Sequence, residues 1–393
     1  MILEIKKITN KIEKLKRINK TNVLDLHSPY FDSSDLNNLA DCIKSTFVST
    51  KGKFIDKFEQ KIKDITGAKY VVLTNSGSSA TYLALRAMDV KPSTEVFIPT
   101  LNYISNANAL CSLNFIPHFI ESECDSFGVD IDLLEKYFKI NFKKKKNLFI
   151  NKKTGNIISG LICTHIFGNT NNIDRVKKFC KKNQLFLIED SSEALGSKFK
   201  SKHLGTFGDV GLLSFNGNKI ITSGGGGALI TNKKHIYTKA RHLSQNAKLK
   251  HLWNYSYDNI GYNIAMPNLN ASLGLSQANR LNKNIIKKKK LYEFYKKFLS
   301  KFSLLKISKI DKDMQSNYWL ITVLISDKSL NIRDKILKYM NKRGIRSRPV
   351  WQLLHTINVF AKYPQMKIKK AKILEKTILN LPSSPHININ EKR

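Results

Sequence analysis

The chain has 393 residues, 41% of them hydrophobic and 10% aromatic, so it can bury a large core and is not an intrinsically disordered protein. Its 67 lysines and arginines outnumber 30 aspartates and glutamates, and the formal net charge of +37 would attract polyanions. Because lysines crowd every region and no aromatic-interleaved basic motif occurs, we expect solvated faces at 143–146 and 287–290, and no nucleic-acid partner.

The N-terminal segment predicts an amphipathic helix. Ile5, Ile8, Ile12 and Leu15 recur at helical spacing, which favours packing on the same chain over the alternative of a membrane-surface helix. The segment lacks the apolar stretch of a signal peptide, and no apolar run reaches transmembrane length. Five scattered cysteines without a CxxC pair indicate free thiols in a reducing compartment and no metal site. We therefore expect a cytoplasmic protein without a membrane partner.

Helical and β-rich patterns alternate from about residue 53 to about residue 230. Phe54, Phe58, Ile62 and Ile65 share one face of a helix that Gly67 would end. The pattern then predicts a helix beginning at Ala80 and, in order, strands at 70–73, 96–98, 161–164, 185–188, 210–215 and 228–230, with helices at 107–113 and 173–182. Continuous apolar strands between helices indicate a parallel sheet covered on both faces.

The alternation weakens after about residue 245. One long helix is predicted over 271–298, followed by strands over 318–325 and 345–350 that flank a helix near 332–340. The expected fold class is therefore α/β. A large domain, residues 1–250, would hold the mostly parallel sheet and the N-terminal helical segment, and residues 251–393 would form a smaller α+β domain.

Three polar segments follow predicted strands, where ligands bind in open α/β sheets. The first, Asn75-Ser76-Gly77-Ser78-Ser79, lies between a strand and a helix. Backbone N–H groups at a helix N-terminus bind phosphate, and Gly77 permits close approach. A plain capped turn is the alternative for this segment taken alone.

The second segment, Glu189-Asp190-Ser191-Ser192-Glu193, follows the apolar strand 185–188. A carboxylate at this place can pair with a protonated ring nitrogen, as a pyridinium cofactor requires. An aspartate that caps the next helix is the alternative.

The third segment places Lys219 between an apolar strand and the run Gly224–Gly227. A solvated lysine is not expected there. To form an imine, the amine must lose its proton, and partial burial with nearby cations would favour this loss. A flexible loop with an exposed lysine is the alternative.

In this order, the motifs NSGSSA, EDSSE and SFNGNK followed by TSGGGG resemble the DegT/DnrJ/StrS aminotransferases, which act on nucleotide-linked keto-sugars. The likeness covers nearly the whole chain, from His27-Ser28-Pro29 to Leu381–Ser384. The segments FVSTKGKFIDKFE, IPTLNYISNANA, GYNIAMPNLNASLG and GIRSRPVWQLLH are most similar to the branch that makes precursors of legionaminic acid and related 4-amino-6-deoxy sugars.

The resemblance implies fold type I of the pyridoxal-phosphate enzymes and a homodimer with shared active sites. It implies that Lys219 binds pyridoxal 5'-phosphate covalently and moves the proton in catalysis, and that Asp190 pairs with the pyridine nitrogen. The other implied cofactor contacts are Tyr103 on the ring, Glu193 beside the ring hydroxyl, and Ser78, Ser79, Ser214 and, from the neighbouring subunit, Asn263 at the phosphate.

Two positions depart from the family pattern. Many members carry Gln or His where this chain has Glu193, and many carry Arg where it has Ala265. The group that receives the carboxylates of glutamate therefore stays open, with Arg346 and Arg348 as candidates.

The implied reaction transfers the amino group of glutamate to the C4 ketone of a nucleotide-linked 6-deoxy sugar, of the UDP-linked N-acetylhexosamine type, and releases 2-oxoglutarate. Its product would serve surface polysaccharide or glycan biosynthesis. A same-fold sugar dehydratase is one rival, but such enzymes replace the lysine by histidine. A non-catalytic sensor or polyanion-binding protein is the other.

Overall fold

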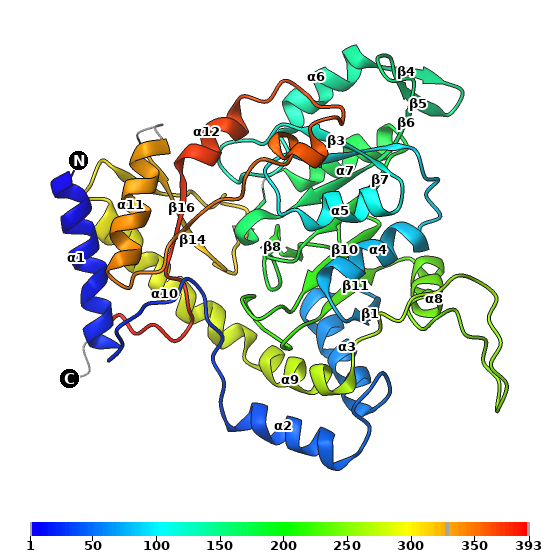
Figure 1. Ribbon diagram of the computed structural model, residues 1–393, viewed down its shortest axis with the longest axis horizontal. Helices are drawn as coiled ribbons and strands as arrows, with labels where there is room; N and C mark the ends of the chain where they lie inside the picture. The colour runs from blue at the N-terminus through cyan, green and yellow to red at the C-terminus, as the bar shows by residue number, and fades with distance from the viewer. Residues whose placement is uncertain (1, 171, 327–329, 391–393) are drawn as a thin grey trace.

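The structure is a computed structural model that describes residues 2–170, 172–326 and 330–390. A nine-stranded sheet with flanking helices forms its larger part, and a four-stranded antiparallel sheet lies beside it (Figure 1). The described elements of the larger part are α2 (Ser33–Lys44), α3 (Lys53–Thr66), β1 (Tyr70–Thr74), α4 (Gly77–Ala87), β2 (Glu95–Pro99), α5 (Ser105–Ser112), β3 (Ile116–Ile120), α6 (Ile131–Asn141), β4 (Phe142–Lys145), β5 (Leu148–Asn151), β6 (Ile157–Thr164), α7 (Ile173–Lys182), β7 (Phe186–Asp190), β10 (Val210–Ser214), β11 (Gly227–Thr231) and α8 (Lys234–Leu243).

The large sheet has the strand order β1-β11-β10-β7-β6-β2-β3, with the β4–β5 hairpin attached to β6. Neighbours from β10 to β3 are parallel, and β11 runs antiparallel to both β10 and β1. The carboxyl ends of β1, β10, β7 and β6 therefore meet at one edge of the sheet. The predicted mostly parallel sheet is confirmed.

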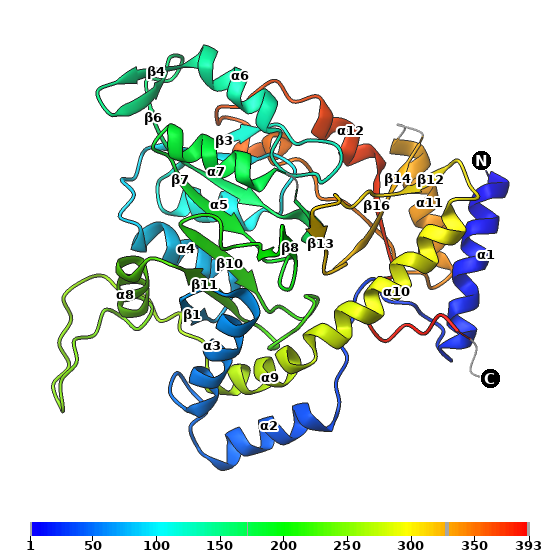
Figure 2. The ribbon, with the colours of Figure 1, turned by 180° about the vertical axis from the view of Figure 1, so that it is seen from behind.

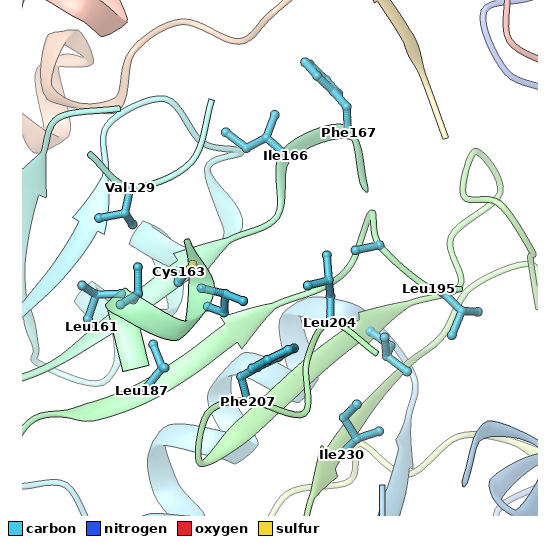
Figure 3. Packing of buried hydrophobic residues seen from close by; sticks show 14 of the residues in the cluster. Val129, Leu161, Cys163, Ile166, Phe167, Leu187, Leu195, Leu204, Phe207 and Ile230 are labelled. Carbon is cyan, nitrogen blue, oxygen red and sulfur yellow. The ribbon is translucent and has the colours of Figure 1, made fainter. Parts of the chain in front are cut away.

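Successive side chains of each strand point to opposite faces of the sheet, so each strand contributes residues to two hydrophobic clusters. Leu161, Cys163 and Leu187 belong to a cluster that α3, α6 and α7 cover, part of which Figure 3 shows. Ile162 and Ile188 belong to a second cluster, which α4, α5 and α8 cover. Both faces are buried, which explains why the strands read as continuous apolar runs.

The smaller sheet has the order β12-β14-β16-β15, with β12 at Leu305–Ile307, β14 at Ile321–Ile325, β16 at Ile378–Leu381 and β15 at Arg348–Pro349. Helices α10 (Leu281–Leu299), α11 (Leu330–Lys342) and α12 (Lys370–Thr377) accompany it. A third, short sheet joins β13 (Met314–Gln315) to the hairpin of β8 (Lys198–Phe199) and β9 (Lys202–His203). It connects the smaller part to the loop after β7.

The N-terminal helix α1 (Ile2–Ile18) packs on its own chain, as predicted. Ile8, Ile12 and Leu15 lie in one buried cluster with residues of α10, α11 and the smaller sheet. Figure 2 shows α1 beside α10 and α11. The domain boundary near residue 250 stays a prediction, and this packing favours counting α1 with the smaller part rather than with the large domain. Within the described residues, no helix is long and apolar enough to cross a membrane.

Three sequence predictions need correction in detail. The helix predicted over 271–298 is two helices, α9 (Asn268–Asn279) and α10, which meet at Arg280. The strands predicted over 318–325 and 345–350 are shorter, because Tyr318 has a positive φ of 55° and only 348–349 pair with β16. In the run 287–290, Lys288 is not solvated: it is fully buried and donates a hydrogen bond to the Ser383 carbonyl. The lysines of β4 are exposed, as expected.

Candidate active site

A cavity of about 340 Å³ opens where the carboxyl ends of β1, β6, β7 and β10 meet. Six of the eight predicted site residues line it, namely Ser78, Tyr103, Asp190, Glu193, Ser214 and Lys219. The structure thus brings together three polar segments that are far apart in the sequence. The other lining residues are Asn75, Ser76, Gly77, Asn102, Ser105, Thr164, Ser192, Asn216, Asn218, Gly225, Gly226, Trp319 and Trp351.

The N-terminus of α4 forms one wall of the cavity. Ser76 caps this helix by accepting a hydrogen bond from the Ser79 N–H at 3.0 Å. A side chain at Gly77 would place its Cβ 3.1 Å from Ser214 Cβ, so glycine lets the start of α4 approach the end of β10. The free N–H groups of the helix start and the hydroxyls of Ser78 and Ser214 together suit an anion such as a phosphate.

Ser79 is not among the residues that line the cavity. Its hydroxyl donates to Asn75 Oδ1 at 2.6 Å and lies 2.8 Å from Ser76 Oγ. These bonds keep the side chain within the helix cap. Of the adjacent serines, Ser78 is the one whose side chain borders the cavity.

Asp190 ends β7 and borders the cavity, whereas the carboxylate of the preceding Glu189 faces away from it. Glu189 accepts hydrogen bonds from the backbone N–H groups of Gly205, Phe207 and Gly208 and is fully buried. Because successive side chains of a strand point to opposite faces of the sheet, Asp190 borders the cavity and Glu189 does not.

Two donors hold the Asp190 carboxylate, which is only 7% exposed. Asn106 Nδ2 donates to Oδ2 at 2.6 Å, and the Ser192 N–H donates to Oδ1 at 3.0 Å. Asn106 is itself buried on α5, and Thr81 of α4 donates to its Oδ1 at 3.3 Å. These hydrogen bonds fix the orientation of the Asp190 carboxylate at the end of β7.

Lys219 lies beyond the end of β10, and its side chain is 14% exposed. Its Nζ is 3.4 Å from Glu193 Oε1 and 4.2 Å from the centroid of the Trp319 ring. The alternative of an exposed lysine on a flexible loop is therefore wrong.

Glu193 is buried and accepts a second hydrogen bond from the Phe167 N–H at 2.8 Å. Burial raises the pKa of the Glu193 carboxyl, while the Lys219 ammonium and the Phe167 N–H act in the opposite direction. A carboxyl group with a raised pKa beside an amine can exchange a proton with it.

Three aromatic residues line the cavity, namely Tyr103, Trp319 and Trp351. Tyr103 is 54% exposed and meets Trp351 edge-on, with ring centroids 6.2 Å apart. Phe167 links Trp351 and Trp319, at centroid distances of 5.6 Å and 6.3 Å. Trp319, Trp351 and Asn106 were not predicted as site residues, because each stands in a stretch that reads as core or as ordinary helix.

Asn263 does not line this cavity. It is exposed on the irregular segment between α8 and α9, and its backbone pairs with Gln245 in an isolated bridge. Arg346 and Arg348 are exposed and are also outside the lining. Among the described residues that line the cavity, Lys219 is the one lysine or arginine.

The residues of the cavity fit pyridoxal phosphate. A buried carboxylate is available for a protonated ring nitrogen, an amine for the aldehyde carbon and a helix N-terminus for the phosphate. One further polar atom lacks a partner: Asn102 Oδ1 is buried without a hydrogen bond, although Asn102 Nδ2 donates to Thr164 Oγ1 at 2.9 Å. A hydrogen-bonding ligand in the cavity would satisfy it.

Comparisons with known proteins agree with this geometry. A model of the DegT/DnrJ/EryC1/StrS aminotransferase family matches residues 29–393. The chain is 31% identical to a GDP-perosamine synthase of Escherichia coli O157:H7, over 93% of this chain and 94% of that protein. It is 26% identical to a UDP-4-amino-4,6-dideoxy-N-acetyl-beta-L-altrosamine transaminase of Campylobacter jejuni subsp. jejuni serotype O:23/36, over 92% and 93% of the two chains.

Solved structures show the same fold. Helicobacter pylori PseC, an aminotransferase of pseudoaminic acid biosynthesis, superposes with a TM-score of 0.85 at 22% identity, covering 93% of this chain and 95% of that chain. The pyridoxal-phosphate form of the sugar aminotransferase Spr1654 of Streptococcus pneumoniae gives 0.81 at 21% identity, covering 92% and 93%.

Proposed function

Because this chain belongs to the DegT/DnrJ/EryC1/StrS aminotransferase family and is a pyridoxal-phosphate-dependent sugar aminotransferase, we propose that it aminates the C4 ketone of a nucleotide-linked 6-deoxy sugar with glutamate as donor. The observation that carries the proposal is one cavity in which a buried carboxylate, Asp190, and a nearly buried amine, Lys219, face a helix N-terminus. The product would enter surface polysaccharide or glycan biosynthesis.

Several residues in and beside the cavity have distinct tasks in this proposal. Lys219 Nζ would hold the cofactor and would move the proton at the Cα of the amino donor. Asp190 would pair with the protonated ring nitrogen, and the hydrogen bond from Asn106 fixes the Asp190 carboxylate in place. Ser78, Ser214 and the start of α4 hold the phosphate, and Tyr103 covers the ring.

When bound, pyridoxal phosphate supplies a cationic ring that takes up the electron pair left by removal of that proton. The amine of Lys219 must be unprotonated to accept this proton and protonated to return it. Glu193, 3.4 Å from Lys219 Nζ, is placed to exchange the proton with the lysine and to hold the amine between the two transfers. The aromatic residues that line the cavity, Tyr103, Trp319 and Trp351, reduce access of water to these groups.

We also propose that the site is completed by a second copy of the chain. Ala265 stands where many members carry Arg, and Lys219 is the one lysine or arginine among the described lining residues, so this lining offers no second cation to the carboxylates of glutamate. Asn263 is exposed and lies outside its own cavity, as expected of a residue that reaches the phosphate site of a neighbour. The proposed assembly is a homodimer with shared sites.

The nucleotide and sugar are the finer part of the proposal. The resemblance of the motifs favours a UDP-linked N-acetylhexosamine, in line with the name of the Campylobacter relative. A GDP-linked 4-keto-6-deoxy sugar is a second candidate, because three GDP-perosamine synthases are 28–31% identical to the chain.

The test is glutamate-dependent amination of a panel of UDP-, GDP- and dTDP-linked 4-keto-6-deoxy sugars, followed by mass spectrometry of the products and by 2-oxoglutarate release. We expect turnover of one nucleotide class, with one 2-oxoglutarate formed for each amino sugar. Release of 2-oxoglutarate with no keto-sugar aminated, or loss of a sugar hydroxyl without gain of nitrogen, would contradict the proposed reaction.

A further inference from the structure

We propose that Asn317, Tyr318 and Trp319, which precede β14 in the smaller part of the molecule, form a clasp that positions Lys219, and that Trp319 is the positioning residue of this clasp. The inference rests on the proposed role of Lys219 as the cofactor-binding lysine. It assigns a task to a segment that contributes no acid, base or phosphate ligand.

Trp319 contacts the lysine segment in two ways. Its indole Nε1–H donates to the Asn218 carbonyl at 2.8 Å, which fixes the peptide bond that leads into Lys219. The face of the same ring lies 4.2 Å from Lys219 Nζ. A cation over an aromatic face is attracted to it, most strongly for tryptophan. One side chain thus holds both the backbone and the amine of the lysine.

Asn317 extends the clasp to the loop after β7. Its side chain is fully buried, and Nδ2 donates to the carbonyls of Glu193 and Leu195 at 2.9 Å and 3.0 Å. Its Oδ1 accepts the Trp319 N–H at 2.9 Å. The partner of Lys219 and the ring above Lys219 are therefore held by the same asparagine.

A third contact reaches the loop after β6. The Asn317 N–H donates to Ser197 Oγ at 2.9 Å, and that hydroxyl donates to the Gly168 carbonyl at 2.7 Å. The clasp therefore joins the loops after β6, β7 and β10, and the last two carry Glu193 and Lys219 to the cavity.

The backbone of the clasp has an uncommon conformation. Tyr318 has φ 55°, in the left-handed region that residues other than glycine adopt at an energetic cost. Its ring packs on Tyr292 with centroids 5.1 Å apart, and its N–H donates to Ser316 Oγ at 3.1 Å. This turn places Asn317 and Trp319 side by side toward the large sheet. Local strain that the surrounding contacts maintain is typical of functional sites.

The experiment uses the full-length protein freed of cofactor, with wild type, Trp319→Phe, Trp319→Leu and the control Ile140→Ala, whose isoleucine is 68% exposed on α6. Pyridoxal phosphate is added at saturation, and the first-order rate constant of the covalent linkage to lysine is followed by absorbance. Affinity for pyridoxamine phosphate, which cannot form the linkage, is measured in parallel, together with the melting temperature.

We expect Trp319→Leu to slow linkage formation by about tenfold or more, because a misplaced reacting group loses rate steeply. Trp319→Phe keeps a ring face but loses the N–H, and should slow it by less. Affinity for pyridoxamine phosphate should stay within about twofold of wild type in both variants, since the phosphate and ring sites are intact. The control should match wild type throughout.

Wild-type linkage rates in both Trp319 variants would overturn the clasp, as would an equal loss of pyridoxamine phosphate affinity, which indicates general damage to the cavity. If Trp319→Leu does not fold, Trp319→Phe alone decides between these outcomes. A separate variant, Lys219→Ala, tests the proposed role of Lys219 itself. If this variant still forms the covalent linkage with pyridoxal phosphate, the proposed role of Lys219 fails, whatever the Trp319 variants show.

Discussion

At the residue scale, the site depends on side chains that other residues hold in place: Asn106 donates a hydrogen bond to the Asp190 carboxylate, and the Trp319 ring lies over Lys219 Nζ. Lys219 was predictable because a lysine between an apolar strand and four glycines is unusual, and Asp190 because it ends a strand. Trp319 was not, because a tryptophan in the stretch Tyr318–Ile325 reads as core. Asn106 was hidden in the same way within helix α5. Ser79 lies next to Ser78, and only the helix cap shows which hydroxyl borders the cavity.

The role of Asp190 predicts a large effect of a very small change. Asp190→Asn keeps the size of the side chain but removes the charge that holds a ring nitrogen protonated. We expect kcat to fall by about a hundredfold or more, corresponding to about 3 kcal/mol of barrier, with an unchanged melting temperature. Steady-state kinetics with the best sugar nucleotide tests this. A kcat within threefold of wild type would refute the role.

The buried carboxyl group of Glu193 is expected to shape the pH dependence of kcat. Burial raises the pKa of its carboxyl, so the group keeps its proton to a higher pH than an ordinary glutamate, and the Lys219 ammonium limits the rise. The pH profile of wild-type kcat should therefore have an acidic limb above the usual carboxyl range, and Glu193→Gln should lack that limb. Profiles of equal shape in both proteins would show that Glu193 does not titrate during turnover.

At the element scale, the sequence predicted the central strands of the large sheet and the helices between them. It predicted the strands at the edges of that sheet and the elements of the smaller part less accurately. Strands buried on both faces have continuous apolar sequences, as at 185–188 and 210–215. The break at Arg280 was not visible, because residues on both sides of it favour a helix. Arg280 forms ion pairs with Asp32 and Asp35, which are distant in sequence and fix the junction of α9 and α10.

The N-terminal helix gives a prediction about stability. α1 lies outside the matched family region, 29–393, yet Ile12 is fully buried in the core of the smaller part. Ile12→Ala should lower the free energy of unfolding by about 3 kcal/mol through lost burial and a new cavity. Leu3→Ala is the matched control, because Leu3 is 65% exposed and should change the free energy by less than about 0.5 kcal/mol. Urea unfolding measures both, and equal values would show that α1 is not part of the core.

At the scale of the whole molecule, the fold and the cavity follow from one chain, whereas the complete site is expected to need two. The sequence could indicate this only through the resemblance, since the segment with Asn263 has little periodicity. The residues shortly before Asn263 expose apolar side chains, including those of Leu252, Trp253 and Tyr255. Such an apolar surface supports the expectation that a second subunit covers it.

Subunit exchange tests the shared site. Lys219→Ala removes the amine of a site, and Asn263→Asp brings a negative charge to the proposed phosphate contact of the neighbouring site. Each variant alone should be inactive. In a mixed dimer, one site carries both defects and the other neither, so mixing should restore up to about a quarter of wild-type activity when chains pair at random. If activity does not return although exchange of subunits is demonstrated, Asn263 does not contribute to the neighbouring site. A fully active monomer in sedimentation would contradict the shared site as well.

The central claim is that Lys219 binds pyridoxal phosphate and that the cavity around it is the site of amino transfer. Borohydride reduction of the yellow cofactor-bound protein, followed by peptide mass spectrometry, tests it most directly. The account predicts that the reduced cofactor is attached to the peptide that contains Lys219, and that Lys219→Ala folds normally but has neither the label nor turnover. A label on any other lysine, or full labelling of Lys219→Ala, would contradict it.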